Sequence, residues 1–282
     1  NSKSVSSKEI VSWKKLPNVK FFGFQSDIAS IYSKTNIACL PSYREGLPKS
    51  LVEAAAAGRA IVTTDVPGCR DAIEQNKTGL LVPINNAMAL ANSIEYLLDN
   101  PDLRKRMGDA GRTLAEKSFS IIKIVNDHMK IFDHLLRKSK KAKVKLLFVV
   151  NVDWFFLSHR LPIALEAIRQ GYEVHLATAL TDKMKTLENY GIIVHSLSLS
   201  RSDTGLWKMG KTFCEIVHVL KLVKPDVVHF VTIKPILIGG IAARIARVPA
   251  VVSAISGLGF VFLDKGIRAL VRLWVVKQLY RL

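Results

Sequence analysis

Two glutamates eight residues apart, Glu45 and Glu53, bracket the start of a predicted helix in the stretch REGLPKSLVEAAAAG. Pro48 suits the first turn of a helix, where its missing N–H group is not needed, and Gly58 suits the end of the alanine-rich run. The free N–H groups and dipole of a helix start favour a phosphate. Because ionised carboxylates accept strong hydrogen bonds from paired hydroxyls, the two glutamates can address two parts of one ligand, a sugar and a ribose.

Short β-branched runs alternate with predicted helices along most of the chain, which is typical of parallel α/β units. Strands are predicted at 19–24, 37–42, 60–65, 79–83, 144–151, 173–178, 192–198, 226–232 and 250–254. Helices are predicted at 27–34, 47–58, 69–75, 86–99, 101–117, 120–137, 155–170, 182–190, 206–223 and 235–247. Because the strands are nearly continuous apolar runs, we expect sheets that are covered on both faces.

The basic segment RKSKKAK at 137–143 separates two such series and marks the expected domain boundary. We expect a Rossmann-like domain at 1–137, a basic linker at 138–143 and a second Rossmann-like domain at 144–282, an α/β fold class with parallel sheets in both halves. Neither half has G-x-G-x-x-G after its first strand, and G-x-x-x-x-G-K-[ST] is absent from the chain. The usual support for dinucleotide or P-loop nucleotide binding is therefore missing.

The composition indicates a globular protein, with 49% apolar residues and a net charge of +18. Such a basic balance favours an anionic partner, which can be nucleic acid, a phospholipid surface or a phosphorylated small molecule. The cysteines form no C-x-x-C pair, which favours a cytosolic setting, and the histidines lack metal-ligand spacing, so no metal site is expected. No signal peptide is expected, and the longest apolar run, 248–263, is too short to span a membrane.

Long stretches of both halves resemble the family-four glycosyltransferases, which are retaining enzymes of the GT-B fold. The string from NVKFFGF through REGLPKSLVEAAAAG to TGLLVP resembles their C-terminal, donor-binding domain, and Glu45 and Glu53 match its E-x7-E pair. The strings LLFVVNVDWFFLSHRLPIALEAIRQGYEVHLAT and KPDVVHFVTIKPILIGGIAARIARVPAVVSAISGLGFVF resemble their N-terminal, acceptor-binding domain. The second half is most similar to members that extend undecaprenyl-diphosphate-linked sugars in bacterial surface glycan assembly.

The resemblance implies hexosyl transfer from a nucleotide-sugar, with UDP as the expected nucleotide, to a lipid-linked or polysaccharide acceptor, without a metal or other cofactor. The implied donor site comprises Gly23, Phe24, Glu45, Gly46, Leu47, Pro48 and Glu53. Glu45 would contact the transferred sugar and stabilise the charge developing there, and Glu53 would hold the ribose. The amides of the two residues after Glu45 would cradle the diphosphate, and the turn at Gly23 would flank the base.

The acceptor site is expected in the second half, at His159, Arg160 and Lys234. His159 and Arg160 are predicted at the N-terminus of the first helix of this half, where a cleft forms at the strand ends. Many family members place a histidine in the loop after the strand matched by VVSAIS, where this chain has Ser256 and Gly257. His159 or Lys234 is expected to take that role, although a helix-start histidine is as often a local cap or a core partner.

The two halves stand in the reverse of the family's order, in which the acceptor domain comes first. We expect both halves to be truncated, and the first to lack the Arg and Lys that clamp the donor diphosphate in the family. A fusion of the tail of one glycosyltransferase to the head of the next is the simplest explanation, with a circular permutant as the alternative. Because loss of a charged contact at the phosphates costs about two or three orders of magnitude in rate, weak or no activity is expected.

Other functions stay open: a non-catalytic nucleotide-sugar-binding module, a nucleotide-sugar epimerase and a nucleic-acid-binding protein. No nucleic-acid partner is expected, because the chain has no reading motif or clustered aromatic platform. The segment at 265–282 mixes basic and apolar residues and suits an anionic membrane surface, although a core helix explains it nearly as well. The expected location is the cytoplasm, peripheral on the inner face of the plasma membrane.

Overall fold

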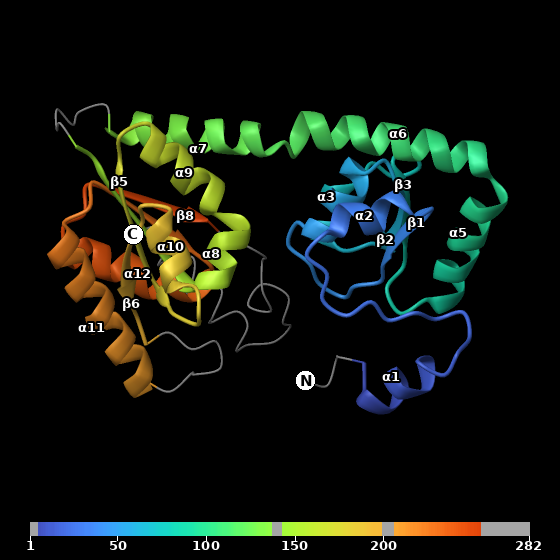
Figure 1. Cartoon of the computed structure of the whole chain (residues 1–282), viewed down its shortest axis with the longest axis horizontal. Helices are drawn as coiled ribbons and strands as arrows, with labels where there is room; N and C mark the ends of the chain where they lie inside the picture. The colour runs from blue at the N-terminus through green and yellow to red at the C-terminus, as the bar shows by residue number, and fades with distance from the viewer. Residues whose placement is uncertain (1–4, 137–142, 199–205, 255–282) are drawn as a thin grey trace, which may run out of the picture.

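The computed structural model describes residues 5–136, 143–198 and 206–254, except for the side chains of 206–208. These residues form two α/β lobes, and every pair of neighbouring strands is parallel (Figure 1). The first lobe has a three-stranded sheet in the order β1-β2-β3, and the second has a five-stranded sheet in the order β6-β5-β4-β7-β8. The predicted α/β fold class with two parallel sheets is confirmed.

The first lobe buries its central strand between two layers of helices. Its elements are α1 (Ser7–Trp13), α2 (Ile28–Ser33), β1 (Ile37–Leu40), α3 (Lys49–Ala56), β2 (Ala60–Thr64), α4 (Pro67–Ala72), β3 (Gly79–Val82), α5 (Ala87–Asp99) and α6 (Pro101–Ser118). Ile61 of β2 packs in a cluster with α3, α4 and α6, while Val62 packs in a second cluster with α5 and α6. This alternation places apolar residues of the strand on both faces, as the continuous apolar run predicts.

The alanine run of α3 allows α6 to pack closely against it. Ala54 and Ala55 are fully buried, and Gly111 of α6 lies against Ala55. Gly58, with φ +69°, follows the end of α3. A Cβ at Gly108 would lie 2.2 Å from the carbonyl oxygen of Gly58. Small residues on both helices therefore set the position of α3, whose N-terminus carries the candidate site.

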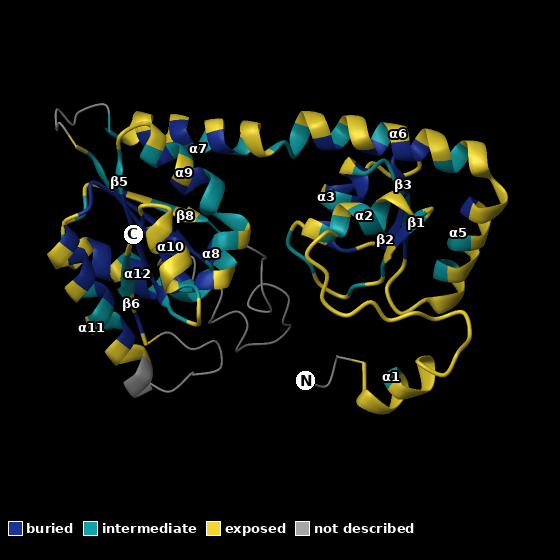
Figure 2. Cartoon of the chain, in the orientation of Figure 1, coloured by how far each residue is buried: buried dark blue, intermediate teal, exposed yellow. Residues whose placement is uncertain are grey.

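The second lobe has a larger core, in which the central strand β4 contributes side chains to both faces. Its elements are β4 (Lys145–Val152), α8 (Asp153–His159), α9 (Leu161–Arg169), β5 (Glu173–Ala179), α10 (Met184–Asn189), β6 (Ile193–Ser196), α11 (Leu206–Val223), β7 (Val227–Val231), α12 (Ile233–Ile245) and β8 (Ala250–Ala254). Leu146, Phe148 and Val150 face one cluster, whereas Leu147 and Val149 face the other, beside α11 and α12. The central strands β2 and β4 and the neighbouring strand β7 are mostly buried, while α1 and the stretch after it are exposed (Figure 2).

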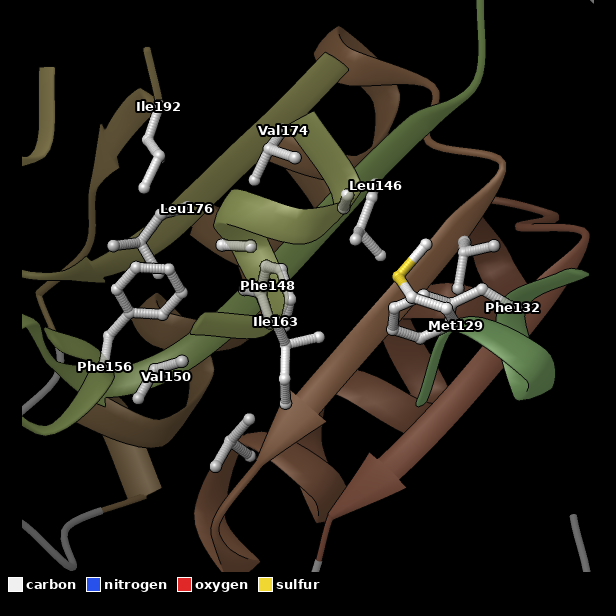
Figure 3. Close-up of a cluster of buried hydrophobic side chains, with 14 of the residues drawn as sticks. Met129, Phe132, Leu146, Phe148, Val150, Phe156, Ile163, Val174, Leu176 and Ile192 are labelled. Carbon is white, nitrogen blue, oxygen red and sulfur yellow. The ribbon is translucent and has the colours of Figure 1, made fainter. Parts of the chain in front are cut away.

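The helix α7 (Ile121–Leu136) follows α6 along one side of the molecule and covers the second lobe (Figure 1). Met129 and Phe132 of α7 join the same buried cluster as Leu146 and Phe148 of β4 (Figure 3). Phe132 is completely buried. The last helix before the expected linker therefore contributes to the core of the second lobe.

Two predicted elements are wrong. Residues 19–24 form no strand, and their aromatic side chains are exposed, because no described strand pairs with them there. The predicted helix at 155–170 is divided into α8 and α9, which meet at Arg160 (φ −127°). Pro162 explains the break, since its missing N–H and its ring do not fit the interior of a helix.

Several predictions fall outside the described residues: most of the linker, the positions Ser256 and Gly257, and the basic segment at 265–282. In the part of the chain that the structure describes, no helix has the length and apolar character needed to cross a membrane.

Candidate functional site

The loop between β1 and α3 holds Glu45 at the carboxyl end of the first sheet. The Ser42 hydroxyl donates a hydrogen bond to Oε1 of Glu45 over 2.8 Å. The backbone of Ser42 is bonded in turn to the side chain of Thr64, at the end of β2, which accepts from the Ser42 amide over 3.0 Å. Thr64, at the end of β2, therefore fixes the loop that follows the neighbouring strand β1.

The start of α4 supports the same loop from behind. A Cβ at Gly68 would lie 1.2 Å from the carbonyl oxygen of Gly46 and 2.6 Å from that of Glu45, so only glycine fits this contact. Cys69 is completely buried beside the hydroxyls of Thr63 and Thr64, and burial raises the pKa of its thiol. The thiol therefore stays neutral and acts as a packing group.

The first turn of α3 leaves backbone donors available. Pro48 is its N-cap, in an extended conformation, and accepts bonds from the amides of Leu51 and Val52. Within the described ranges, the amides of Gly46 and Leu47 donate no hydrogen bond. Together with the helix dipole, these donors favour an anion at this position.

Glu53 lies one helical turn after Lys49 in α3, on the same face of the helix. Their side chains form an ion pair of 3.5 Å, with Glu53 about one-third exposed. The charge of Glu53 also contributes to the raised pKa of Tyr32, of which burial is the larger cause. Glu45 and Glu53 therefore stand at two separate positions along the start of one helix, as the sequence predicts.

His159 of the second lobe lies within electrostatic range of α3. Its ring stacks on Phe155, with centroids 4.1 Å apart, and Nδ1 lies 2.6 Å from the Ser158 hydroxyl. Burial is the largest cause of its lowered pKa, and the charges of Lys49 and Glu53 act on it in opposite directions. The structure thus brings His159 into electrostatic range of the α3 site, at the end of α8 and not at the predicted helix start.

Arg160 and Lys234 lie at the carboxyl ends of the second sheet. Arg160 joins α8 to α9, its Nη1 donates to the His159 carbonyl oxygen, and its buried Nε has no hydrogen-bond partner among the described residues. Burial lowers the pKa of Arg160. Lys234 stands in the first turn of α12, after Thr232, which has φ +74° and a buried hydroxyl without a hydrogen-bond partner in the part of the chain that the structure describes.

Gly23 and Phe24 belong to neither the loop that holds Glu45 nor the helix that holds Glu53. They lie between α1 and α2, Gly23 has φ +64°, and Phe24 is 94% exposed. In the described ranges, no hydrogen bond or ion pair joins either residue to the residues around Glu45.

Sequence reasoning missed three supporting residues, Ser42, Thr64 and Gly68. The proline-glycine pair after TTDV at 63–66 was a signal for a close backbone approach, but nothing in the sequence linked it to Glu45. Ser42 and Thr64 also line a shallow cavity of about 340 Å³, together with Pro83, Asn85 and other residues at the strand ends. Over the described ranges, no cluster of three or more His, Cys, Asp or Glu side chains has the geometry of a metal site.

Two glycosyltransferase family models match the chain, one in each half. The model described as glycosyl transferases group 1 matches residues 3–114, and the model described as glycosyl transferase 4-like matches residues 145–281. The first half thus matches the group 1 family and the second the 4-like family, in the order that the sequence predicts.

Individual relatives are similar over less than half of the chain. A Campylobacter jejuni N,N'-diacetylbacillosaminyl-diphospho-undecaprenol alpha-1,3-N-acetylgalactosaminyltransferase is 34% identical over 120 residues, which are 42% of this chain and 31% of that protein. The Staphylococcus aureus capsular polysaccharide biosynthesis glycosyltransferase CapM is 32% identical over 124 residues, 44% of this chain and 33% of CapM. The matches thus span about a third of the length of these curated relatives.

Among solved structures, Anabaena HepE in complex with UDP-glucose is 20% identical to this chain, with a TM-score of 0.43, and the match covers 45% of this chain and 35% of HepE. The two family models account for most of both lobes, and both describe glycosyltransferases. The chain thus joins a segment that matches the glycosyl transferases group 1 model to one that matches the glycosyl transferase 4-like model.

Proposed function

We propose that this chain binds a nucleotide-sugar, with UDP as the nucleotide, and serves transfer of the hexosyl group to a lipid-linked or polysaccharide acceptor in bacterial surface glycan biosynthesis. The observation that carries the proposal is the placement of Glu45 in the loop just before α3 and of Glu53 on α3, with His159 of the second lobe within electrostatic range of Glu53. The names of the Campylobacter jejuni and Staphylococcus aureus relatives, which refer to an undecaprenol-linked acceptor and to capsular polysaccharide, support this class of acceptor.

In this proposal the donor lies along the start of α3. Glu53 accepts hydrogen bonds from the ribose hydroxyls, and the free amides of Gly46 and Leu47, beside Pro48, bind the diphosphate. Glu45 contacts the transferred sugar. Gly23 and Phe24 flank the base, with the exposed ring of Phe24 as its stacking surface.

The chemistry follows from where charge develops. As the bond from the anomeric carbon to the diphosphate breaks, positive charge grows on the sugar and negative charge on the leaving phosphate. The carboxylate of Glu45 stabilises the first, and the amides at the helix N-terminus stabilise the second. An acceptor hydroxyl then bonds to the anomeric carbon, with retention of configuration.

On the acceptor side, His159 lies within electrostatic range of the donor helix, and Arg160 and Lys234 supply positive charge near the strand ends. The lowered pKa of His159, with burial as its main cause, keeps the imidazole neutral near pH 7. A neutral ring can accept the proton of the acceptor hydroxyl, and cationic side chains suit an acceptor that carries phosphate.

Calorimetric titration of the chain with UDP, UDP-N-acetylglucosamine, UDP-N-acetylgalactosamine and GDP-mannose tests the donor site. Glu53→Ala should weaken binding of every ligand that shares the preferred nucleotide, because the ribose contact is common to them. Glu45→Ala should weaken binding of the nucleotide-sugar but leave UDP binding nearly unchanged. Glu95→Ala, on the exposed surface of α5, is a matched control that should bind like the unsubstituted chain.

Binding of none of these ligands by a chain shown to be folded would contradict the proposal. Donor binding without sugar transfer to an undecaprenyl-diphosphate-linked saccharide would instead favour the non-catalytic module. High affinity for DNA combined with no nucleotide-sugar binding would favour the nucleic-acid alternative.

A further inference from the structure

The carboxylate of Glu45 depends on a single side chain for its orientation. Within the described ranges, the Ser42 hydroxyl is its hydrogen-bond partner, at 2.8 Å from Oε1, and no ion pair reaches it. The same hydroxyl lies 3.2 Å from the Arg44 carbonyl oxygen and accepts weakly from the Arg44 amide over 3.4 Å. Because a hydroxyl has one proton and a bond to a carboxylate is the stronger, Glu45 is the preferred acceptor.

Ser42 is itself held by the neighbouring strand. The Thr64 side chain accepts a hydrogen bond from the Ser42 amide over 3.0 Å and donates one to the Ser42 carbonyl oxygen. Thr64 is only 6% exposed and belongs to β2, whose position is set by β1 and β3 on either side. A chain of hydrogen bonds therefore runs from a rigid strand, through the Ser42 backbone and hydroxyl, to the Glu45 carboxylate.

We propose that Ser42 is a positioning residue that aims the Glu45 carboxylate at the transferred sugar, and that Thr64 holds Ser42 in place for this task. The inference rests on the proposed function, since it assigns Glu45 the sugar contact. It gives the donor site two separately supported parts: Glu53 lies on a regular helix, whereas Glu45 lies in a loop and needs a partner.

This arrangement predicts a selective defect. Without the hydroxyl, the Glu45 carboxylate can rotate toward water and loses its fixed direction, while the start of α3 and Glu53 stay in place. Loss of a hydrogen bond to a charged group should therefore reduce UDP-sugar affinity by about five- to tenfold in Ser42→Ala. Affinity for UDP, which lacks the sugar, should change by less than about twofold.

Calorimetric titration of the full chain with UDP-N-acetylglucosamine, or whichever UDP-sugar binds most tightly, and with UDP measures both affinities. Ser42→Thr retains a hydroxyl and should restore most of the sugar-dependent affinity, with the adjacent cavity as space for the methyl group. Thr64→Val should share the selective defect of Ser42→Ala. Thr63→Val is the matched control, because the Thr63 hydroxyl donates to the Leu40 carbonyl oxygen and, in the described ranges, has no hydrogen bond to the side chain of Ser42 or Glu45.

A double variant separates positioning from simple loss of stability. If Ser42 acts through Glu45, adding Ser42→Ala to Glu45→Gln should cost little further affinity, because the aimed carboxylate is already gone. Equal losses for UDP and UDP-sugar, additive effects in the double variant, or no loss in Ser42→Ala would each overturn the inference while leaving the proposed function standing. Absence of UDP-sugar binding by the unsubstituted chain would overturn both.

Discussion

In the first lobe, the elements behind the candidate site approach one another at glycine and alanine, whereas in the second lobe large apolar and aromatic side chains cover the sheet. Gly108 meets Gly58 and Gly68 meets Gly46, with no space for a Cβ at either contact. The second lobe instead buries four aromatic rings in one cluster: Phe132, Phe148, Phe156 and His229. Backbone contacts fix the position of a loop, while large side chains provide most of the burial that stabilises a lobe.

The helix α7 also provides large side chains to the second lobe: it follows the first lobe in sequence but packs in the core of the second. Phe132→Ala should have the largest effect of the substitutions considered, a loss of about 3–5 kcal/mol from the stability of the second lobe. Hydrogen exchange should show faster exchange in β4 and β7, while β1, β2 and β3 keep their protection. Ile131→Ala, at a position 45% exposed on the same helix, is the control.

If Phe132→Ala reduced protection from hydrogen exchange equally in both sheets, the two lobes would unfold as one unit, and their cores could not be treated as independent. The measurement must be resolved by segment, because a two-lobe chain does not guarantee two-state unfolding.

Gly68→Ala tests the backbone contacts of the first lobe. The added Cβ would lie 1.2 Å from the Gly46 carbonyl oxygen, so the loop that carries Glu45 has to move. We expect a loss of about 1–3 kcal/mol in stability, together with weaker nucleotide-sugar binding by calorimetry. Gly240→Ala in α12, where a Cβ meets no atom within 4 Å, should instead stabilise the chain by about 0.5–1 kcal/mol. Retained nucleotide-sugar affinity in Gly68→Ala would show that the loop tolerates displacement.

The same contrast explains what the sequence could predict. The strands β4 and β7 could be predicted from continuous apolar runs, because a strand that is buried on both faces consists mostly of consecutive apolar residues. The stretch at 19–24 has the same composition but no paired neighbour among the described strands, and composition cannot reveal pairing. The helix α1 had a usable signal, the capping box of Ser6 and Glu9, which the polar character of its surroundings obscured.

The candidate site was partly predictable for a similar reason. Glu45 and Glu53 could be found because they flank a helix start, which is a local feature. Their support could not, because the bond from Thr64 to Ser42 depends on the parallel register that sets Leu40 opposite Thr63. The electrostatic effect of Lys49 and Glu53 on His159 likewise joins residues of different lobes, so no single segment of the sequence encodes it.

The smallest effect expected is a pH dependence of the second lobe. His229 of β7 is completely buried between the rings of His128 of α7 and Phe148, and over the described ranges neither ring nitrogen has a hydrogen-bond partner. Burial lowers its pKa well below 6.5, and the charges of Arg160 and His128 lower it further. His229 therefore stays neutral in the folded lobe at pH values where it is protonated in the unfolded chain.

Because the unfolded state binds the extra proton, the stability of the second lobe should fall as pH drops below about 6.5, by up to about 1.4 kcal/mol per pH unit from this residue. His229→Phe removes the titrating ring but keeps an aromatic one, so the slope of unfolding free energy against pH between 7 and 5 should become smaller. His134→Phe, at an exposed position on α7, should keep the slope of the unsubstituted chain. An unchanged slope in His229→Phe would mean that other buried histidines, such as His175, cause the pH dependence. The pH dependence would then not arise from the ring that packs against α7.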